Sequence, residues 1–434
     1  MDKMADVLGR AGAWCGQNKY LSAIKNAFQN FMPLTIAGAI GVLWCNVLVN
    51  ESTGLGLFFK PIMALDFLNP AFQAVNFCTI SCITVGITLG IAQEIGVWNM
   101  GAERAGYIPG LVGLAAWLSV TNTSHMVDGA KEAFTGVAGN ELGATGLFTG
   151  MIIGVLSVEL FCFFEKQDAL KIKMPEQVPP GVARAFEVLV PATITLIITA
   201  CIGSACYNLT GLYLNDVIKN GIQGPLGAVG ATIPGVMIIY LVIMLFWLVG
   251  IHGNNMLSAV KEALFTPLAL ENVEAFNKGE TPKNIINMYF LQMCGEFGGS
   301  GVTIGLVIAI MIFGKREDNK AIASLSLVPG LFNINETVTF GIPMVLNPIL
   351  GIPFVFACLV TILVGYVLTV IGFCPVACLT VPWTTPPIVF GFLACGANVM
   401  GAVTQAILIV VSTVIYVPFL ISYEKYQNKQ AAEV

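Results

Sequence analysis

The side chains best suited to chemistry lie in one short stretch, residues 333–336, whose sequence is Asn-Ile-Asn-Glu. Its surroundings are almost free of charge, and an ionisable group at membrane depth costs about 2.5 to 3.5 kcal/mol to insert. Such a carboxylate is either functional or satisfied by helix packing, and the cost favours function. Because amides and carboxylates hydrogen-bond hydroxyl groups, we predict that Asn335 and Glu336 bind a hydroxyl-rich ligand and that Glu336 can accept a proton.

A second set of candidates surrounds His252, which follows an apolar run and precedes the amides Asn254 and Asn255. Its place at a predicted helix break favours a ligand role for His252 and Asn254, and the alternative is a core histidine bonded to a carbonyl. Trp247 and Trp383 could stack on the apolar face of a sugar ring, or could anchor helices at the membrane interface. Carboxylate, amide, imidazole and indole together are the groups that sugar recognition needs.

Two further features have simple structural interpretations. The run Gly298-Gly-Ser-Gly301 could direct backbone amides at an anion, although glycines in membrane helices often serve close packing. The chain has twelve cysteines, most of them single in apolar segments and without a histidine-rich partner motif. We therefore predict buried fillers, with no metal and no cofactor.

Composition places these residues in a membrane. Of the 434 residues, 56% are hydrophobic and 10% are charged, whereas soluble domains have about 25% charged residues. The formal net charge of −5 gives no reason to expect nucleic-acid binding. We predict an all-α polytopic membrane protein with about ten transmembrane helices and about two re-entrant elements, near residues 251–270 and 330–350.

Apolar runs and their breaks define the elements that position the candidates. Spans are predicted at about 31–49, 71–95, 107–120, 144–164, 188–207, 233–250, 354–373 and 400–421, and the run 285–313 is interrupted at 295–301. Gly330, Gly341, Pro343 and Pro348 divide the stretch around Glu336 into pieces too short to span a bilayer. Broken backbone at that depth is tolerated where it lines a cavity or is covered by protein.

Basic residues predict the topology. Residues 1–30 are predicted to form an amphipathic helix with its basic side chains in the cytoplasm, and segment 165–187 is the strongest cytoplasmic marker in the interior of the chain. Both the N-terminus and the charged tail at 422–434 are therefore expected in the cytoplasm. Segment 165–187 also marks a predicted boundary between residues 1–186 and residues 187–434.

At these residues the chain resembles enzyme IIC, the membrane component, of the lactose/cellobiose/chitobiose family of the phosphoenolpyruvate-dependent sugar phosphotransferase system. The most specific blocks are Gly-Ile-His-Gly at 250–253 and Phe-Asn-Ile-Asn-Glu at 332–336. The family usually has proline after the glutamate, where this chain has Thr337. Other matching blocks lie at 23–28, 32–38, 174–180, 266–272, 298–301 and 381–387.

The resemblance implies a sugar transporter of the bacterial plasma membrane that works as a homodimer. Residues 1–186 would form the dimer, and residues 187–434 would bind the sugar and carry it across the membrane lipid by an elevator-like movement. The phosphoryl group would come from a cysteine of a separate IIB protein, with a IIA protein upstream. No cysteine of this chain would then be phosphorylated.

The resemblance also implies roles for single residues. Glu336 would contact the sugar hydroxyl that becomes phosphorylated, with His252 beside it. Trp247 and Trp383 would line the site. Asn140 is added because it precedes a matching Leu-Gly block.

Other functions stay open on the residues alone. Glu336 and His252 could carry protons in a proton-coupled sugar symporter. The chain could also be an intramembrane enzyme acting on a lipid-linked sugar, or a sugar-sensing receptor. The particular sugar is not readable from the sequence: the family favours β-linked disaccharides of the cellobiose type, and lactose and chitobiose stay open.

Overall fold

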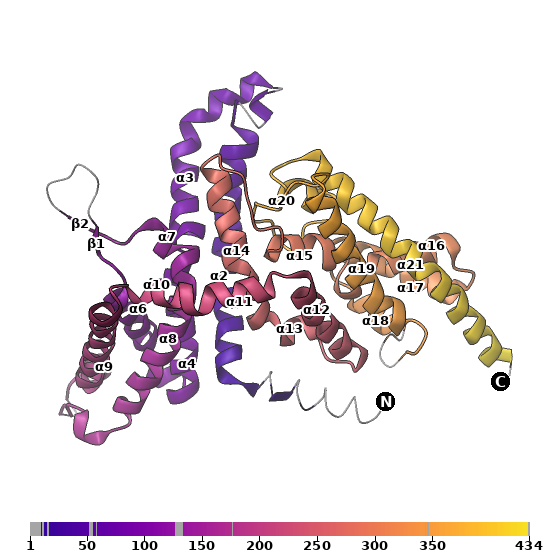
Figure 1. Cartoon of the computed structure of the whole chain (residues 1–434). Helices are drawn as coiled ribbons and strands as arrows, with labels where there is room; N and C mark the ends of the chain where they lie inside the picture. The colour runs from indigo at the N-terminus through magenta and orange to yellow at the C-terminus, as the bar shows by residue number, and fades with distance from the viewer. Residues whose placement is uncertain are drawn as a thin grey trace. The chain divides into compact units, whose positions relative to one another are not determined.

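The computed structural model describes residues 10, 13–14, 17–51, 55–57, 59–125, 133–175, 177–342, 344 and 347–432, and this part is almost entirely helical (Figure 1). The strands found in these ranges are β1 (Ser124–His125) and β2 (Phe134–Thr135), which pair antiparallel. The prediction of an all-α protein is confirmed.

Several helices are long and apolar enough to cross a membrane. Within the described ranges, 6 helices meet this test, and a bent pair raises the number to 7. The bent pair, Met288–Val302 with Ile304–Phe313, turns by 59° at the predicted interruption. The fold is therefore that of a polytopic membrane protein, but the expected count of about ten crossings is not confirmed. The 6 helices are Lys19–Leu48, Lys60–Met100, Ala144–Glu165, Pro180–Thr210, Gly351–Val370 and Val399–Gln430.

The chain divides into two compact units. One consists mainly of Ala39–Ala74 and Ala228–Val434, and we call it unit 1; the other, unit 2, consists of Gln17–Gly38 and Val75–Gly227. This division differs from the predicted boundary at residue 186, because α9 (Pro180–Thr210) packs against α6 (Ile108–Val120) and α8 (Ala144–Glu165) of unit 2. That one half dimerises and the other binds sugar stays a prediction.

Unit 2 is built around α4, α6 and α8, which pack against one another over a core that includes the fully buried Trp117. The chain passes between the units within α2 (Lys19–Leu43), α3 (Asn69–Cys78) and α11 (Gly224–Gly230). Of the central helices, α4 spans Ile83–Met100. The other elements of unit 2 are η4 (Ile80–Cys82), α5 (Ala102–Ala105), α7 (Gly139–Leu142), η5 (Asp168–Leu170), α10 (Leu214–Ile218) and η6 (Lys219–Gln223).

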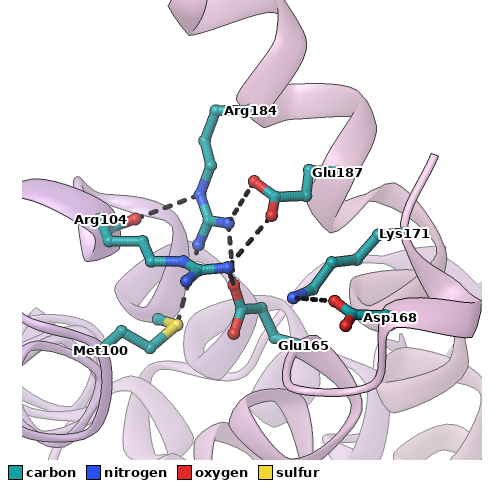
Figure 2. Close-up of polar contacts among 7 residues, drawn as sticks. All are labelled: Met100, Arg104, Glu165, Asp168, Lys171, Arg184 and Glu187. Carbon is teal, nitrogen blue, oxygen red and sulfur yellow. Dashed lines mark hydrogen bonds and ion pairs between the residues drawn. The ribbon is translucent and has the colours of Figure 1, made fainter. Parts of the chain in front are cut away.

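The predicted cytoplasmic marker contains an ion-pair network at the ends of α8 and α9 (Figure 2). The Glu165 carboxylate, only 3% exposed, lies 2.9 Å from Arg184 Nη1 and 2.9 Å from Arg104 Nη2. Glu187 pairs with the same two guanidinium groups at 2.8 and 3.1 Å. A buried carboxylate needs such partners, so part of the basic charge in this segment has a structural use.

Unit 1 carries most of the predicted site residues. In it α16 packs against α17 and α21, and α19 packs against α12, α15 and α21. Its elements are η1 (Trp44–Leu48), η2 (Leu55–Leu57), η3 (Lys60–Leu68), α12 (Ile233–Leu248), α13 (Gly253–Met256), α14 (Ser258–Asn277), α15 (Met288–Gly295), η7 (Ser300–Val302), α16 (Ile304–Phe313), α17 (Glu317–Leu331), α18 (Glu336–Gly341), α19 (Gly351–Val370), α20 (Val389–Ala394) and α21 (Val399–Ala432).

The two segments predicted to be re-entrant each contain helix breaks, and that they re-enter the membrane stays a prediction. A break follows α12, and α14 then runs to Asn277, beyond the predicted element at 251–270. The polar residues of this extension have partners: the Asn272 amide donates to the Asn284 and Ala377 carbonyls at 2.8 and 3.0 Å. In 330–350, α18 is a separate short helix, whereas residues 343 and 345–346 lie outside the described residues. The tail is helical as far as Ala432, where α21 ends.

Candidate functional site

His252 lies at the turn between α12 and α13. Gly250 has a φ of 81°, in the region that favours glycine, and lets the chain reverse after α12. His252 then caps α13, and its Nδ1 accepts a hydrogen bond from the Asn255 amide at 3.3 Å. Because Nδ1 is the acceptor, the neutral ring carries its proton on Nε2. His252 therefore presents an N–H donor on the side of the ring away from the cap.

That donor faces Glu336, at the first turn of α18. His252 Nε2 and Glu336 Oε1 are 3.8 Å apart, and the two side chains are 37% and 48% exposed. The gap is too long for a good hydrogen bond. The structure thus brings together two residues separated by 84 positions in the sequence. A half-exposed acceptor beside a half-exposed donor is open to a ligand hydroxyl.

Trp247 adjoins the same pair. Its ring centroid lies 4.5 Å from that of His252 and 6.4 Å from that of Phe354, and the side chain is buried. The indole Nε1 has no hydrogen-bond partner within the described part of the chain. An unpaired buried donor costs about 1 to 3 kcal/mol. Trp247 is therefore better placed to donate a hydrogen bond than to offer both ring faces for stacking.

The two asparagines before Glu336 hold its segment in place. Asn333 has a φ of 62°; its Oδ1 accepts from the Gly298 amide at 2.6 Å, and its Nδ2 donates to the carbonyls of Trp383 and Thr385. The buried Asn335 donates through Nδ2 to the Ser300 carbonyl at 2.7 Å. Asn335 thus positions Glu336, and its predicted contact with a ligand stays a prediction.

The glycine run 298–301 serves close packing. Gly298, Gly299 and Gly301 have φ values of 70°, 89° and 74°. A Cβ on Gly299 would lie 2.5 Å from Asn335 Cγ, so only glycine lets the asparagine approach. Since the Gly298 amide already donates a hydrogen bond to Asn333 Oδ1, the structure supports the packing interpretation and not the anion-binding one.

Three other predicted site residues have different surroundings. Asn254 has a partner at each end of its amide: its Nδ2 donates to Ser300 Oγ at 2.9 Å and its Oδ1 accepts from Lys261 Nζ at 3.0 Å. The Trp383 side chain is 43% exposed, and its carbonyl is tied to Asn333. Asn140 is an exposed residue of α7, in unit 2 and not in unit 1 with the others.

Sequence reasoning missed a buried polar cluster beside these residues. Lys261 and Glu296 form an ion pair, with side chains 8% and 19% exposed, and the fully buried Tyr240 donates to Glu296 Oε1 at 2.7 Å. A signal was available, because a lysine and a glutamate inside apolar stretches of a membrane protein are themselves candidates for function.

Comparison with known proteins agrees with this fold, which is that of a polytopic membrane protein. The family model of the phosphotransferase system, EIIC, matches residues 25–358. The chain belongs to this EIIC family, in the lactose/cellobiose/chitobiose group. As a IIC component it transports a sugar and works with a IIB protein.

Individual relatives cover nearly the whole chain. It is 33% identical to the PTS system oligo-beta-mannoside-specific EIIC component of Bacillus subtilis (strain 168), over 98% of this chain and 94% of the relative. It is 29% identical to the PTS system cellobiose-specific EIIC component of Lactococcus lactis subsp. lactis (strain IL1403), over 98% of each. The crystal structure of the transporter ChbC, the IIC component from the N,N'-diacetylchitobiose-specific phosphotransferase system, matches with a TM-score of 0.88 and 29% identity over 97% of each chain.

Proposed function

We propose that this chain binds a β-linked disaccharide of the cellobiose type in unit 1 and presents one of its hydroxyls for phosphorylation by a separate IIB protein. The observation that carries the proposal is the facing pair His252 and Glu336, 3.8 Å apart and both partly exposed. The relatives named for oligo-β-mannoside and cellobiose support a β-linked sugar.

The chemistry follows from the two facing groups. A sugar hydroxyl between them would donate its hydrogen to the Glu336 carboxylate and accept one from His252 Nε2–H. As the phosphorus–sulfur bond to the IIB cysteine breaks and the phosphorus–oxygen bond forms, Glu336 takes the hydroxyl proton. Phosphoryl transfer depends mainly on positioning and charge stabilisation, so orienting the hydroxyl is a sufficient task for this subunit.

The experiment is a phosphorylation screen in proteoliposomes. Cellobiose, β-mannobiose, lactose and N,N'-diacetylchitobiose are supplied with phosphoenolpyruvate and the upstream proteins, and the α-linked maltose is the control sugar. The expected result is sugar phosphate from at least one β-linked disaccharide and none from maltose. Uptake of unmodified sugar driven by a proton gradient alone would instead establish the symporter.

The remaining expectations belong to the same proposal. The protein would be a homodimer in the bacterial plasma membrane, with both termini in the cytoplasm. Light scattering of the purified protein tests the dimer, and a monomer at the working concentration contradicts it. Reporter fusions at residues 1 and 434 test the two termini, and a periplasmic signal at either end contradicts the topology.

A further inference from the structure

The buried cluster beside the site forms a continuous chain of polar contacts. It begins at Tyr240 in α12, passes to Glu296 after α15 and continues to Lys261 in α14. Lys261 then donates to Asn254 Oδ1 at 3.0 Å, in the helix that His252 caps. The cluster therefore ends on the same short helix as the proposed ligand group.

Contacts beyond Asn254 extend this chain to the helix of Glu336. Since Lys261 can only donate, the Asn254 atom that it touches must be oxygen, and the amide nitrogen is left to donate to Ser300 Oγ at 2.9 Å. The Ser300 carbonyl in turn accepts from Asn335 at 2.7 Å, and Asn335 is the cap residue directly before Glu336. The ion pair thus orients an amide that links the His252 helix to the Glu336 helix.

His252 and Glu336 need such a link if their separation is to be fixed. At 3.8 Å they do not hold each other in place, and each is partly exposed. Removing one partner of a buried ion pair is costly, yet apolar residues of similar volume often replace a whole pair without loss of stability. A buried ion pair is therefore weak evidence for stability, and specifying one geometry is an alternative use for it.

We propose that Lys261 and Glu296 are positioning residues, which set the spacing of His252 and Glu336 through Asn254, Ser300 and Asn335, and thereby the affinity for sugar. This inference rests on the proposed function. It assigns Lys261 and Glu296 a role that they exert through their neighbours.

The test measures the dissociation constant of the purified protein for its sugar by calorimetry, without phosphoenolpyruvate. Replacing both charges, Lys261→Met with Glu296→Leu, leaves no unpaired charge in this ion pair. The buried Tyr240 hydroxyl loses its acceptor, so the melting temperature is expected to fall slightly while the protein stays folded. Because Asn254 then loses its charged donor, the dissociation constant is expected to rise about tenfold. The control is the exposed ion pair Lys278–Glu274 at the end of the same helix: Lys278→Met with Glu274→Leu is expected to leave affinity unchanged.

Coupling to Asn254 separates positioning from a merely structural role. Asn254→Ala alone is expected to weaken binding, and adding the double change at residues 261 and 296 should weaken it no further. A folded double variant with wild-type affinity, or effects that add fully, would overturn the inference. If the double variant does not fold, Ser300→Ala decides, because it removes only the oxygen that accepts from Asn254, and unchanged affinity would again overturn it.

These readouts are separate from the proposed function. Wild-type protein that binds sugar but yields no sugar phosphate contradicts the proposed function, and the comparison of dissociation constants still decides the inference. If the wild-type protein yields sugar phosphate and the variants keep wild-type affinity, the proposed function is supported and the inference is overturned.

Discussion

Replacing Glu336 with glutamine tests the central step of the proposed mechanism. The change keeps the shape of the side chain and one acceptor oxygen, and removes the negative charge and the ability to take a proton. The side chain is 48% exposed, and His252 lies 3.8 Å away without a hydrogen bond. The local structure should therefore survive, and any loss should arise from the contact with sugar.

The magnitude can be worked out for each step. A hydrogen bond to a charged group contributes about 1.5 to 3 kcal/mol, and the glutamine retains part of it, so the dissociation constant should rise about tenfold or less. A positioned proton acceptor contributes about 10² to 10⁴ in rate, and glutamine supplies none of this. Phosphorylation at saturating sugar should accordingly fall by about 10² or more.

The assay compares sugar affinity with the initial rate of phosphoenolpyruvate-dependent phosphorylation, both on purified protein with the IIA and IIB proteins in excess. The control is the same change at an exposed carboxylate of unit 1, Glu317→Gln, whose side chain is 88% exposed. It should alter neither quantity. Equal losses in affinity and rate would show that Glu336 only binds, and an unchanged rate in Glu336→Gln would refute its proposed role.

Four other changes test the structure around the site. Thr337→Pro should leave phosphorylation within about twofold, because Thr337 is in the first turn of α18, where its amide has no intrahelical acceptor; a large loss of rate would contradict this. Trp247→Phe should weaken sugar binding about threefold to tenfold in calorimetry if the unpaired indole N–H donates to the sugar, and unchanged affinity would show that it does not. Gly299→Ala should weaken binding and cost about 1 to 3 kcal/mol, since its φ is 89° and the new Cβ meets Asn335; normal affinity would contradict the packing argument. Gly253→Ala places a Cβ 2.0 Å from the Ile243 carbonyl oxygen and should lower the melting temperature, at a cost of about 1 to 3 kcal/mol, whereas an unchanged melting temperature would show that α12 and α13 are not so tightly packed.

The position of Thr337 shows where motif and structure agree. The family motif places proline after the glutamate, and the structure puts that position in a first helical turn. Proline is tolerated there because it removes only an amide hydrogen that the helix does not use. Threonine at this position is therefore expected to leave the placement of Glu336 unchanged.

The sequence by itself determined the membrane class and the places of most helices. Apolar runs and their breaks are local properties, so the interruption at residues 295–301 and the break before His252 could be located without a structure. The family was also readable, because the blocks around His252 and Glu336 are short, contiguous and specific.

Only the tertiary structure decided what the polar side chains of those blocks do. Asn254 and Asn335 have their amide nitrogens engaged by Ser300, and Glu336 faces His252 with about half of its side chain exposed. The partner of Lys261 is Glu296, 35 positions further along the chain. A hydrogen bond needs two groups at one point in space, and no local pattern says which distant segments meet there.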